Sequence, residues 1–193
     1  MQLDIRADTA TTPPTSSMHA RCAPFDNHSA DMNFLNKIDT LLNLSGSYFD
    51  YEGLPVRSHC NPGASNEDLN LISVDSSIFL PEDYIQFLKL HNGCVLFSYE
   101  DLGGFEFLGS SNIKKENENQ KNTYEEDWGK NLTVFCTVLG DGDFLAFRKG
   151  ALNNYDILDC YHDDTPKNWK VICSSFSEFM NRLLDSKGKR FWL

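Results

Sequence analysis

Two closely spaced carboxylates, Asp141 and Asp143, are separated only by Gly142. Such a pair can bind a divalent cation or share general-acid and general-base work. A calcium loop would need further oxygen ligands at fixed spacing, but Phe144 and Leu145 follow instead. Asp-Gly is also typical of a tight hairpin turn. The sequence therefore favours a turn here over a metal or catalytic site.

Histidines and cysteines could form a zinc site on paper, from His59-Cys60, His91-x-x-Cys94 and Cys160-x-His162. Structural zinc sites typically use two ligand pairs at short spacing, and the chain has no Cys-x-x-Cys motif. Cys94 and Cys160 also fall in stretches expected to be buried strands. We therefore predict no metal and no cofactor.

The six cysteines stand at positions 22, 60, 94, 136, 160 and 173. An even number is compatible with disulfides in a secreted chain, but no basic region followed by an apolar run indicates a signal peptide. Most of them stand among apolar or β-prone residues, so we expect thiols that are buried as small hydrophobic side chains: Cys94, Cys136, Cys160 and Cys173. This favours a reducing, cytoplasmic compartment.

Motifs for nucleophilic or phosphate chemistry are missing from the sequence. No serine lies in a Gly-x-Ser-x-Gly motif. Gly103-Gly104 lacks the spacing and the following Lys of a phosphate-binding loop. A reactive cysteine needs a polar cleft that lowers its pKa, and these cysteines have apolar neighbours. The sequence therefore predicts a protein that is not an enzyme.

The net charge of −11 indicates what kind of partner the chain could bind. A strongly acidic surface repels phosphate backbones, which argues against direct binding of nucleic acid. It attracts a basic protein and accelerates the encounter with it, although acidity can also serve solubility alone. No apolar run approaches the roughly 18 residues of a membrane span.

Acidic stretches with an aromatic neighbour have the composition of a site that recognises a basic protein. The alternative is ordinary solvated surface, with Trp128 in the core. The candidate contacts are Glu100, Asp101, Glu125, Glu126, Asp127, Trp128, Asp141, Asp143, Asp163 and Asp164.

Composition divides the chain into a tail and one domain. Residues 1–31 are polar and interrupted by prolines, which predicts a disordered tail. Residues 32–193 are expected to form a single domain. A helix is expected from Phe34 with Gly46 as its stop, and a short strand at 69–74 lies in a long connection over 46–79.

The clearest helix is expected from Pro81 to Asn92-Gly93. Pro81 suits the first helical position, and an Asn-Gly pair can end a helix in a left-handed conformation. Tyr84, Phe87, Leu88 and His91 then fall on one apolar face.

Further along, the apolar period changes to two. Strands are expected at 94–97, 105–108, 132–139, 144–147 and 155–161, with a short helix near Ile113 and then a loop within 110–130. Ser175 and Glu178 form a capping box that begins a final amphipathic helix. The fold class predicted is α+β: a central antiparallel sheet of about four to six strands, flanked by N-terminal helices and a C-terminal helix.

Three motifs in this order resemble the Smi1/Knr4 (SUKH) superfamily. They are the helix Leu80-Pro81-Glu82-Asp83-Tyr84-x-x-Phe87-Leu88-x-x-x-Asn92-Gly93, the turn Gly140-Asp141-Gly142-Asp143 before an aromatic strand, and the closing Ser175-Phe176-x-Glu178-Phe179-x-x-x-Leu183. The chain departs from the family pattern in the cysteine-containing connection at 46–79 and the polar insert at 110–130.

The resemblance implies an α+β fold and a protein-binding role. Most bacterial members are regarded as immunity proteins that neutralise a polymorphic or contact-dependent toxin, often a nuclease. Fungal members act as regulatory scaffolds in cell-wall signalling. We expect a cytoplasmic immunity protein with a basic toxin domain as its partner, and keep an intracellular scaffold as the alternative. The resemblance supplies no catalytic residues.

Overall fold

The computed structural model describes residues 32–44, 48–100, 102–152 and 154–193. The predicted disordered tail, the stop at Gly46 and the candidate contact Asp101 lie outside these residues. Within them, the strands form one eight-stranded antiparallel sheet, in which the spatial order follows the chain order. The predicted α+β fold is confirmed, with more strands than the expected four to six.

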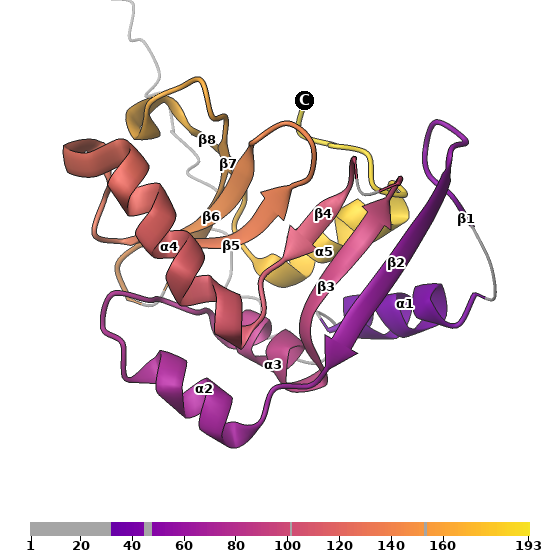
Figure 1. Cartoon of the computed structure of the whole chain (residues 1–193), viewed down its shortest axis with the longest axis horizontal. Helices are drawn as coiled ribbons and strands as arrows, with labels where there is room; N and C mark the ends of the chain where they lie inside the picture. Colours follow the sequence, from indigo (N-terminus) through magenta and orange to yellow (C-terminus); the bar gives the residue numbers. More distant parts are fainter. Residues whose placement is uncertain (1–31, 45–47, 101, 153) are drawn as a thin grey trace, which may run out of the picture.

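The strands are β1 (Tyr48–Phe49), β2 (Pro55–Pro62), β3 (His91–Ser98), β4 (Phe105–Phe107), β5 (Leu132–Val138), β6 (Phe144–Lys149), β7 (Tyr155–Cys160) and β8 (Lys170–Cys173). The helices are α1 (Asn33–Leu42), α2 (Asn66–Ser73), α3 (Glu82–Leu90), α4 (Ser110–Tyr124) and α5 (Phe176–Asp185), with the short 3₁₀ helices η1 (Glu125–Asp127) and η2 (Pro166–Asn168). Helices α1 and α5 pack together on one side of the sheet, and α4 lies on the other side against β5 (Figure 1).

A cluster of aromatic rings fills the space between the sheet and α3 and α5. Its members are completely or almost completely buried: Tyr84, Phe87, Phe107, Phe135, Phe147, Phe176 and Phe179. Phe135 and Phe147, on neighbouring strands, stack with ring centroids 4.0 Å apart. The apolar faces predicted for α3 and α5 are therefore confirmed as core.

The predicted ends of α3 were wrong at both termini. Pro81 precedes the helix in an extended conformation, and the helix ends at Leu90. His91 begins β3, so it is not part of the helical face. Gly93 does have a positive φ of +89°, but it lies within β3, where a Cβ would stand 2.8 Å from the amide nitrogen of Gly109. The Asn-Gly pair thus lets β3 pass close to the start of α4, and it does not end α3.

Asp83 joins the first turn of α3 to the first turn of α5. The Tyr155 hydroxyl donates to both of its carboxylate oxygens at 2.8 Å. The backbone N–H of Ser177 also donates to it, at 3.0 Å. A carboxylate at the start of a helix satisfies N–H groups that have no helical partner. This residue of the helix motif therefore positions the closing helix.

Two connections differ from their predicted structure. Residues 69–73 belong to α2, which begins with a capping box between Ser65 and Asp68, and Val74 follows the end of this helix, so the predicted strand is absent here. The polar stretch after Ile113 continues as the helix α4 to Tyr124, and not as a loop. Asn117 is its second buried position, so α4 lacks the apolar stripe that reveals a helix in a sequence.

One expectation about the cysteines was wrong. Cys94 is joined to Cys60, its direct cross-strand neighbour on β2, in a disulfide. Cys136, Cys160 and Cys173 are buried free thiols, as predicted. Burial raises the pKa of all three, which keeps them protonated and unreactive. Among the helices that the structure describes, none combines the length and apolar character required to span a membrane.

Candidate partner-binding site

Three loops and the C-terminal segment meet at one end of the sheet, the upper end in Figure 1. The loops are residues 124–128 around η1, the β5–β6 turn at 139–143, and the β7–β8 connection at 161–169. We call this region the acidic end. It contains most of the carboxylates that the sequence suggested as partner contacts.

Aromatic contacts hold η1 against the β7–β8 connection. Tyr124 and Trp128 stack with centroids 6.3 Å apart, and Trp169 meets the Tyr124 ring edge-on at 5.1 Å. The Tyr124 hydroxyl also donates to the backbone carbonyl of His162 at 3.3 Å. Trp128 is half-buried in this cluster. It therefore supports the acidic end from beneath while part of its ring stays at the surface.

Asp143 is the centre of an ion-pair network under this surface. It accepts hydrogen bonds from the backbone N–H of His162 at 3.0 Å and from the Arg190 guanidinium at 3.0 Å. The His162 Nδ1 lies 2.8 Å from the same carboxylate. Arg190 also pairs with Asp141. The network ties the β5–β6 turn to the β7–β8 connection and to the C-terminal segment.

The network shifts the pKa values of its members. Burial disfavours the charged form of Asp143, but the hydrogen bonds from His162 and Arg190 outweigh burial and lower the pKa of this carboxyl. The hydrogen bond to Asp143 raises the pKa of His162 in return. Charged side chains of the network thus hold the β5–β6 turn in place.

The β5–β6 turn has the structure that its Gly-Asp-Gly-Asp sequence predicts. Gly140 has φ +95°, and a Cβ there would lie 2.0 Å from the carbonyl oxygen of Leu102. Only glycine accepts this close approach without displacement of the β3–β4 connection. The same contact places the β3–β4 connection, with Glu100 exposed at its start, next to the acidic end.

The structure sorts the candidate contacts by accessibility. The exposed ones are Glu100, Glu125, Glu126, Asp127, Asp141 and Asp163. Asp164 is half-buried and accepts hydrogen bonds from Thr165 and Asn168. Asp143 is only 5% exposed and its oxygens are occupied by internal partners. Asp143 therefore lies beneath the surface and positions its neighbours, while the exposed carboxylates remain the candidate contacts.

A groove with an apolar lining adjoins the acidic end. It holds about 550 Å³ and lies between the β1–β2 turn, the β3–β4 connection and the C-terminal segment. Large apolar side chains stay exposed along it: Tyr51, Leu54, Tyr99, Leu102 and Leu193. Arg190 belongs to both the groove and the acidic network. An apolar centre beside charged groups is the usual composition of a protein interface.

Sequence reasoning missed Arg190 and the groove, and it considered His162 only as a possible zinc ligand and not as a partner of Asp143. A basic run, Lys187-Gly188-Lys189-Arg190, was the only signal for the arginine, and nothing in the local sequence connects it to a turn almost fifty positions earlier. The exposed apolar residues of the groove come from connecting segments without an apolar period, so no sequence pattern marked them.

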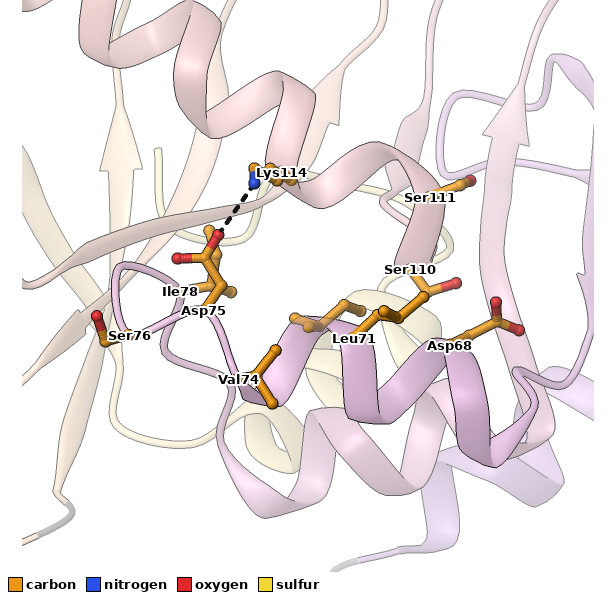
Figure 2. Close-up of a pocket in the computed structure, with 10 residues that line it drawn as sticks. Asp68, Leu71, Val74, Asp75, Ser76, Ile78, Ser110, Ser111 and Lys114 are labelled. Atoms are coloured by element: carbon orange, nitrogen blue, oxygen red, sulfur yellow. Dashed lines mark ion pairs between the residues drawn. The ribbon is translucent and has the colours of Figure 1, made fainter.

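A second groove, between α2 and the start of α4, holds about 700 Å³ (Figure 2). Leu71 and Val74 line it, and Lys114 forms an ion pair with Asp75 at 3.5 Å across it. This pair joins two of the charged side chains of the groove, and the third, Asp68, is held by Ser65 in the capping box of α2. No general acid and base converge among the described residues that line it.

Two curated proteins are similar to this chain over most of its length. Immunity protein RhsIB of Dickeya dadantii (strain 3937) is 26% identical over 168 residues, which cover 82% of this chain and 99% of that protein. The uncharacterised protein YobM of Bacillus subtilis (strain 168) is 24% identical over 133 residues, which cover 67% of this chain and 70% of that protein. The family model described as SMI1 / KNR4 family (SUKH-1) matches residues 63–182, from the connection before α2 into the closing helix. The chain therefore belongs to the SMI1/KNR4 (SUKH-1) family.

Proposed function

We propose that this chain is a cytoplasmic immunity protein that binds and neutralises a polymorphic or contact-dependent toxin. The similarity to an immunity protein over 99% of that protein's length carries the proposal. The partner is a basic nuclease domain, and the chain masks its active or substrate-binding surface. The chain acts by binding and not by catalysis.

The charge of the molecule supports a basic partner. The chain has a net charge of −11, and the carboxylates of η1, the β5–β6 turn and the β7–β8 connection gather at one end. A surface that binds nucleic acid is positively charged, so this end complements it. Charge complementarity accelerates association, while buried apolar anchors mainly slow dissociation.

The groove beside the acidic end supplies the apolar part of the interface. Its exposed rings and aliphatic chains, including Tyr99 and Leu102, would be buried by a docked toxin domain. Arg190 stays fixed between the two parts because Asp141 and Asp143 hold its guanidinium. The interface is thus pre-formed, which lowers the entropy cost of binding.

Co-expression with the toxin encoded beside the gene tests this function. We expect the chain to restore growth and to form a stoichiometric complex in a pull-down with the toxin. Undiminished killing with no complex would overturn the proposal. A deletion phenotype without any toxin would instead support the regulatory scaffold.

Matched charge variants test the docking surface. Neutralising Glu125, Glu126 and Asp127 to amides should lower the association rate constant at low salt by about tenfold. The control neutralises three exposed carboxylates on other parts of the surface, Glu67, Glu82 and Glu118. Equal effects of the two triple variants would show that general charge, and not the acidic end, attracts the toxin.

A further inference from the structure

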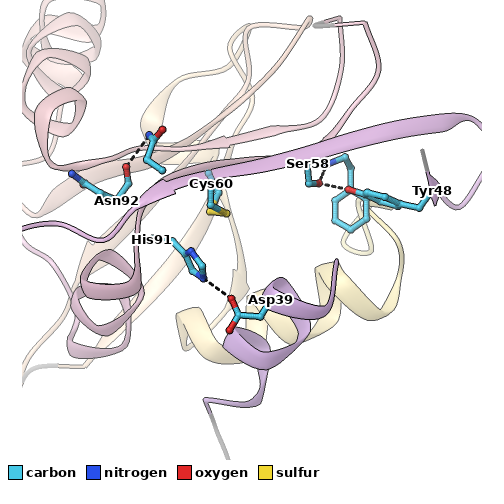
Figure 3. The surroundings of a disulfide bond; sticks show 9 residues. Asp39, Tyr48, Ser58, Cys60, His91 and Asn92 are labelled. Carbon is cyan, nitrogen blue, oxygen red and sulfur yellow. Dashed lines mark hydrogen bonds and ion pairs between the residues drawn. A yellow bond between two sulfur atoms is a disulfide. The ribbon is translucent and has the colours of Figure 1, made fainter. Parts of the chain in front are cut away.

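A cysteine pair, a histidine and a carboxylate meet where β2, β3 and α1 approach one another. One ligand atom each from Cys60, His91 and Cys94 lie within 4.8 Å of one another. The Asp39 carboxylate of α1 lies 3.3 Å from the Nε2 of His91. Figure 3 shows the His91 ring between Cys60 on the strand and Asp39 on the helix.

A bulge in β3 brings His91 and Cys94 to the same face. Residues three apart on a regular strand point to opposite faces. Here the β2–β3 register shifts between Cys60 and Pro62, and Gly93 adopts φ +89° at this point of β3. The shift adds one residue on one strand, so both side chains face inwards.

The Nε2 atom of His91 is available for a further ligand. It is buried and has no hydrogen-bond partner among the described residues, although Asp39 lies within ion-pair distance. A buried nitrogen without a partner is costly unless something satisfies it. Because the Asp39 side chain is 58% exposed, an ion can reach this position from solvent.

We propose that, when the Cys60–Cys94 disulfide is reduced, Cys60, Cys94, His91 and Asp39 bind one Zn²⁺ ion. Thiolate, imidazole and carboxylate are the ligands that Zn²⁺ takes in proteins, usually four in a tetrahedron. Two nitrogen or oxygen ligands at Zn–ligand distances of about 2.0–2.1 Å stand about 3.3–3.4 Å apart in that geometry. The distance of 3.3 Å between His91 Nε2 and the Asp39 carboxylate fits this edge.

The sulfurs must separate to bind the ion. A dithiol reductant supplies two electrons to the S–S bond, each cysteine sulfur takes up a proton, and the dithiol becomes a disulfide. Zn²⁺ then displaces the two thiol protons, which pass to water. The Cα atoms of Cys60 and Cys94 are 4.0 Å apart, and rotation of the two side chains after reduction can open the sulfurs to the distance of about 3.8 Å that they have in a tetrahedron around Zn²⁺. In a reducing compartment the ion would replace the disulfide as the link between β2 and β3. It would also join α1 to these strands through Asp39.

Zinc binding by the full-length chain tests the site. The chain is reduced with a phosphine, freed of the reductant without air, and titrated with Zn²⁺ in competition with a chromophoric chelator. We expect one equivalent of Zn²⁺ per reduced chain, none for the oxidised chain, and thiolate-to-metal absorption when Co²⁺ is used. Reduced chain that leaves all Zn²⁺ with the chelator would overturn the proposal, and so would equal binding by the oxidised form.

Variants locate the ion. Cys60→Ser should abolish stoichiometric binding, and Asp39→Asn, at an exposed position, should weaken it by about tenfold or more without loss of the fold. Cys173→Ser is the matched control, because Cys173 is a buried free thiol on β8. Cys22→Ser is a second control for a thiol outside the described residues. Unchanged affinity in Cys60→Ser, or loss of binding in either control, would refute this site.

Discussion

Replacing Asn117 by alanine should destabilise the fold strongly, because its amide takes the place of a missing strand. Pairing between β4 and β5 ends at Cys136, and Val134 lies beyond this end. The Asn117 side chain accepts from the Val134 N–H at 2.8 Å and donates to the Val134 carbonyl at 3.0 Å. Asn117 itself is only 7% exposed, so water does not substitute easily.

The size of the effect follows from the two backbone groups that lose their partner. Each buried group left unpaired costs about 1–3 kcal/mol, which gives about 2–6 kcal/mol for both. Alanine has a better helix propensity than asparagine, which stabilises the folded state by roughly 0.5 kcal/mol. We therefore expect the free energy of unfolding to fall by about 1.5–5.5 kcal/mol, measured by urea denaturation with linear extrapolation.

Asn119 on the same helix provides the control. It is exposed, and its side chain makes a long contact of 3.4 Å with Glu116. Asn119→Ala carries the same gain in helix propensity and should leave stability unchanged or slightly raised. If Asn117→Ala lowered stability no more than Asn119→Ala does, the argument that this amide completes the sheet would be refuted.

Three further results are expected. Tyr84→Phe should lower the free energy of unfolding by about 1–3 kcal/mol in the same urea assay, because it leaves a buried backbone carbonyl without its donor; an unchanged value would contradict this. Gly140→Ala should lower the thermal midpoint more than Gly53→Ala does, since both have positive φ but only the first would collide with backbone; equal losses would rule out the collision. The hydrogen bond to Asp143 raises the pKa of His162, so protonation favours the folded state: the stabilisation is complete below the unfolded pKa of about 6.5 and is lost as the pH rises through the folded pKa. The free energy of unfolding should therefore fall more in the wild type than in His162→Gln between about pH 6 and about pH 8, and parallel curves would refute the role of this pair.

Much of the fold could be predicted from local pattern. Tyr84, Phe87 and Leu88 recur at helical spacing and are buried, and the Ser175 cap begins the closing helix as expected. Strands β3 to β7 were anticipated because alternating or continuous apolar runs report burial on a sheet. Strands β1, β2 and β8 were not, because most of their residues are exposed or half-buried and show no apolar alternation.

The candidate site was predicted only in part. Local composition identified the carboxylates at Glu125–Asp127 and Asp163, but could not show that they share one end of the sheet. Asp143 belongs to the same turn as Asp141, yet one is buried and the other is exposed. The side chains that contact Asp143, those of Arg190 and His162, come from other parts of the chain.

The sequence by itself determined the order of most helices and strands, the turn at Gly140–Asp143, and the family. These features depend on the apolar period and on the conformational preferences of a few neighbouring residues, which the chain carries locally. Tertiary structure alone decided that Arg190 and His162 meet at Asp143, and that Cys60, His91, Cys94 and Asp39 meet between β2, β3 and α1. Those meetings depend on strand order and on a bulge that reverses the direction of side chains, and no local pattern encodes either.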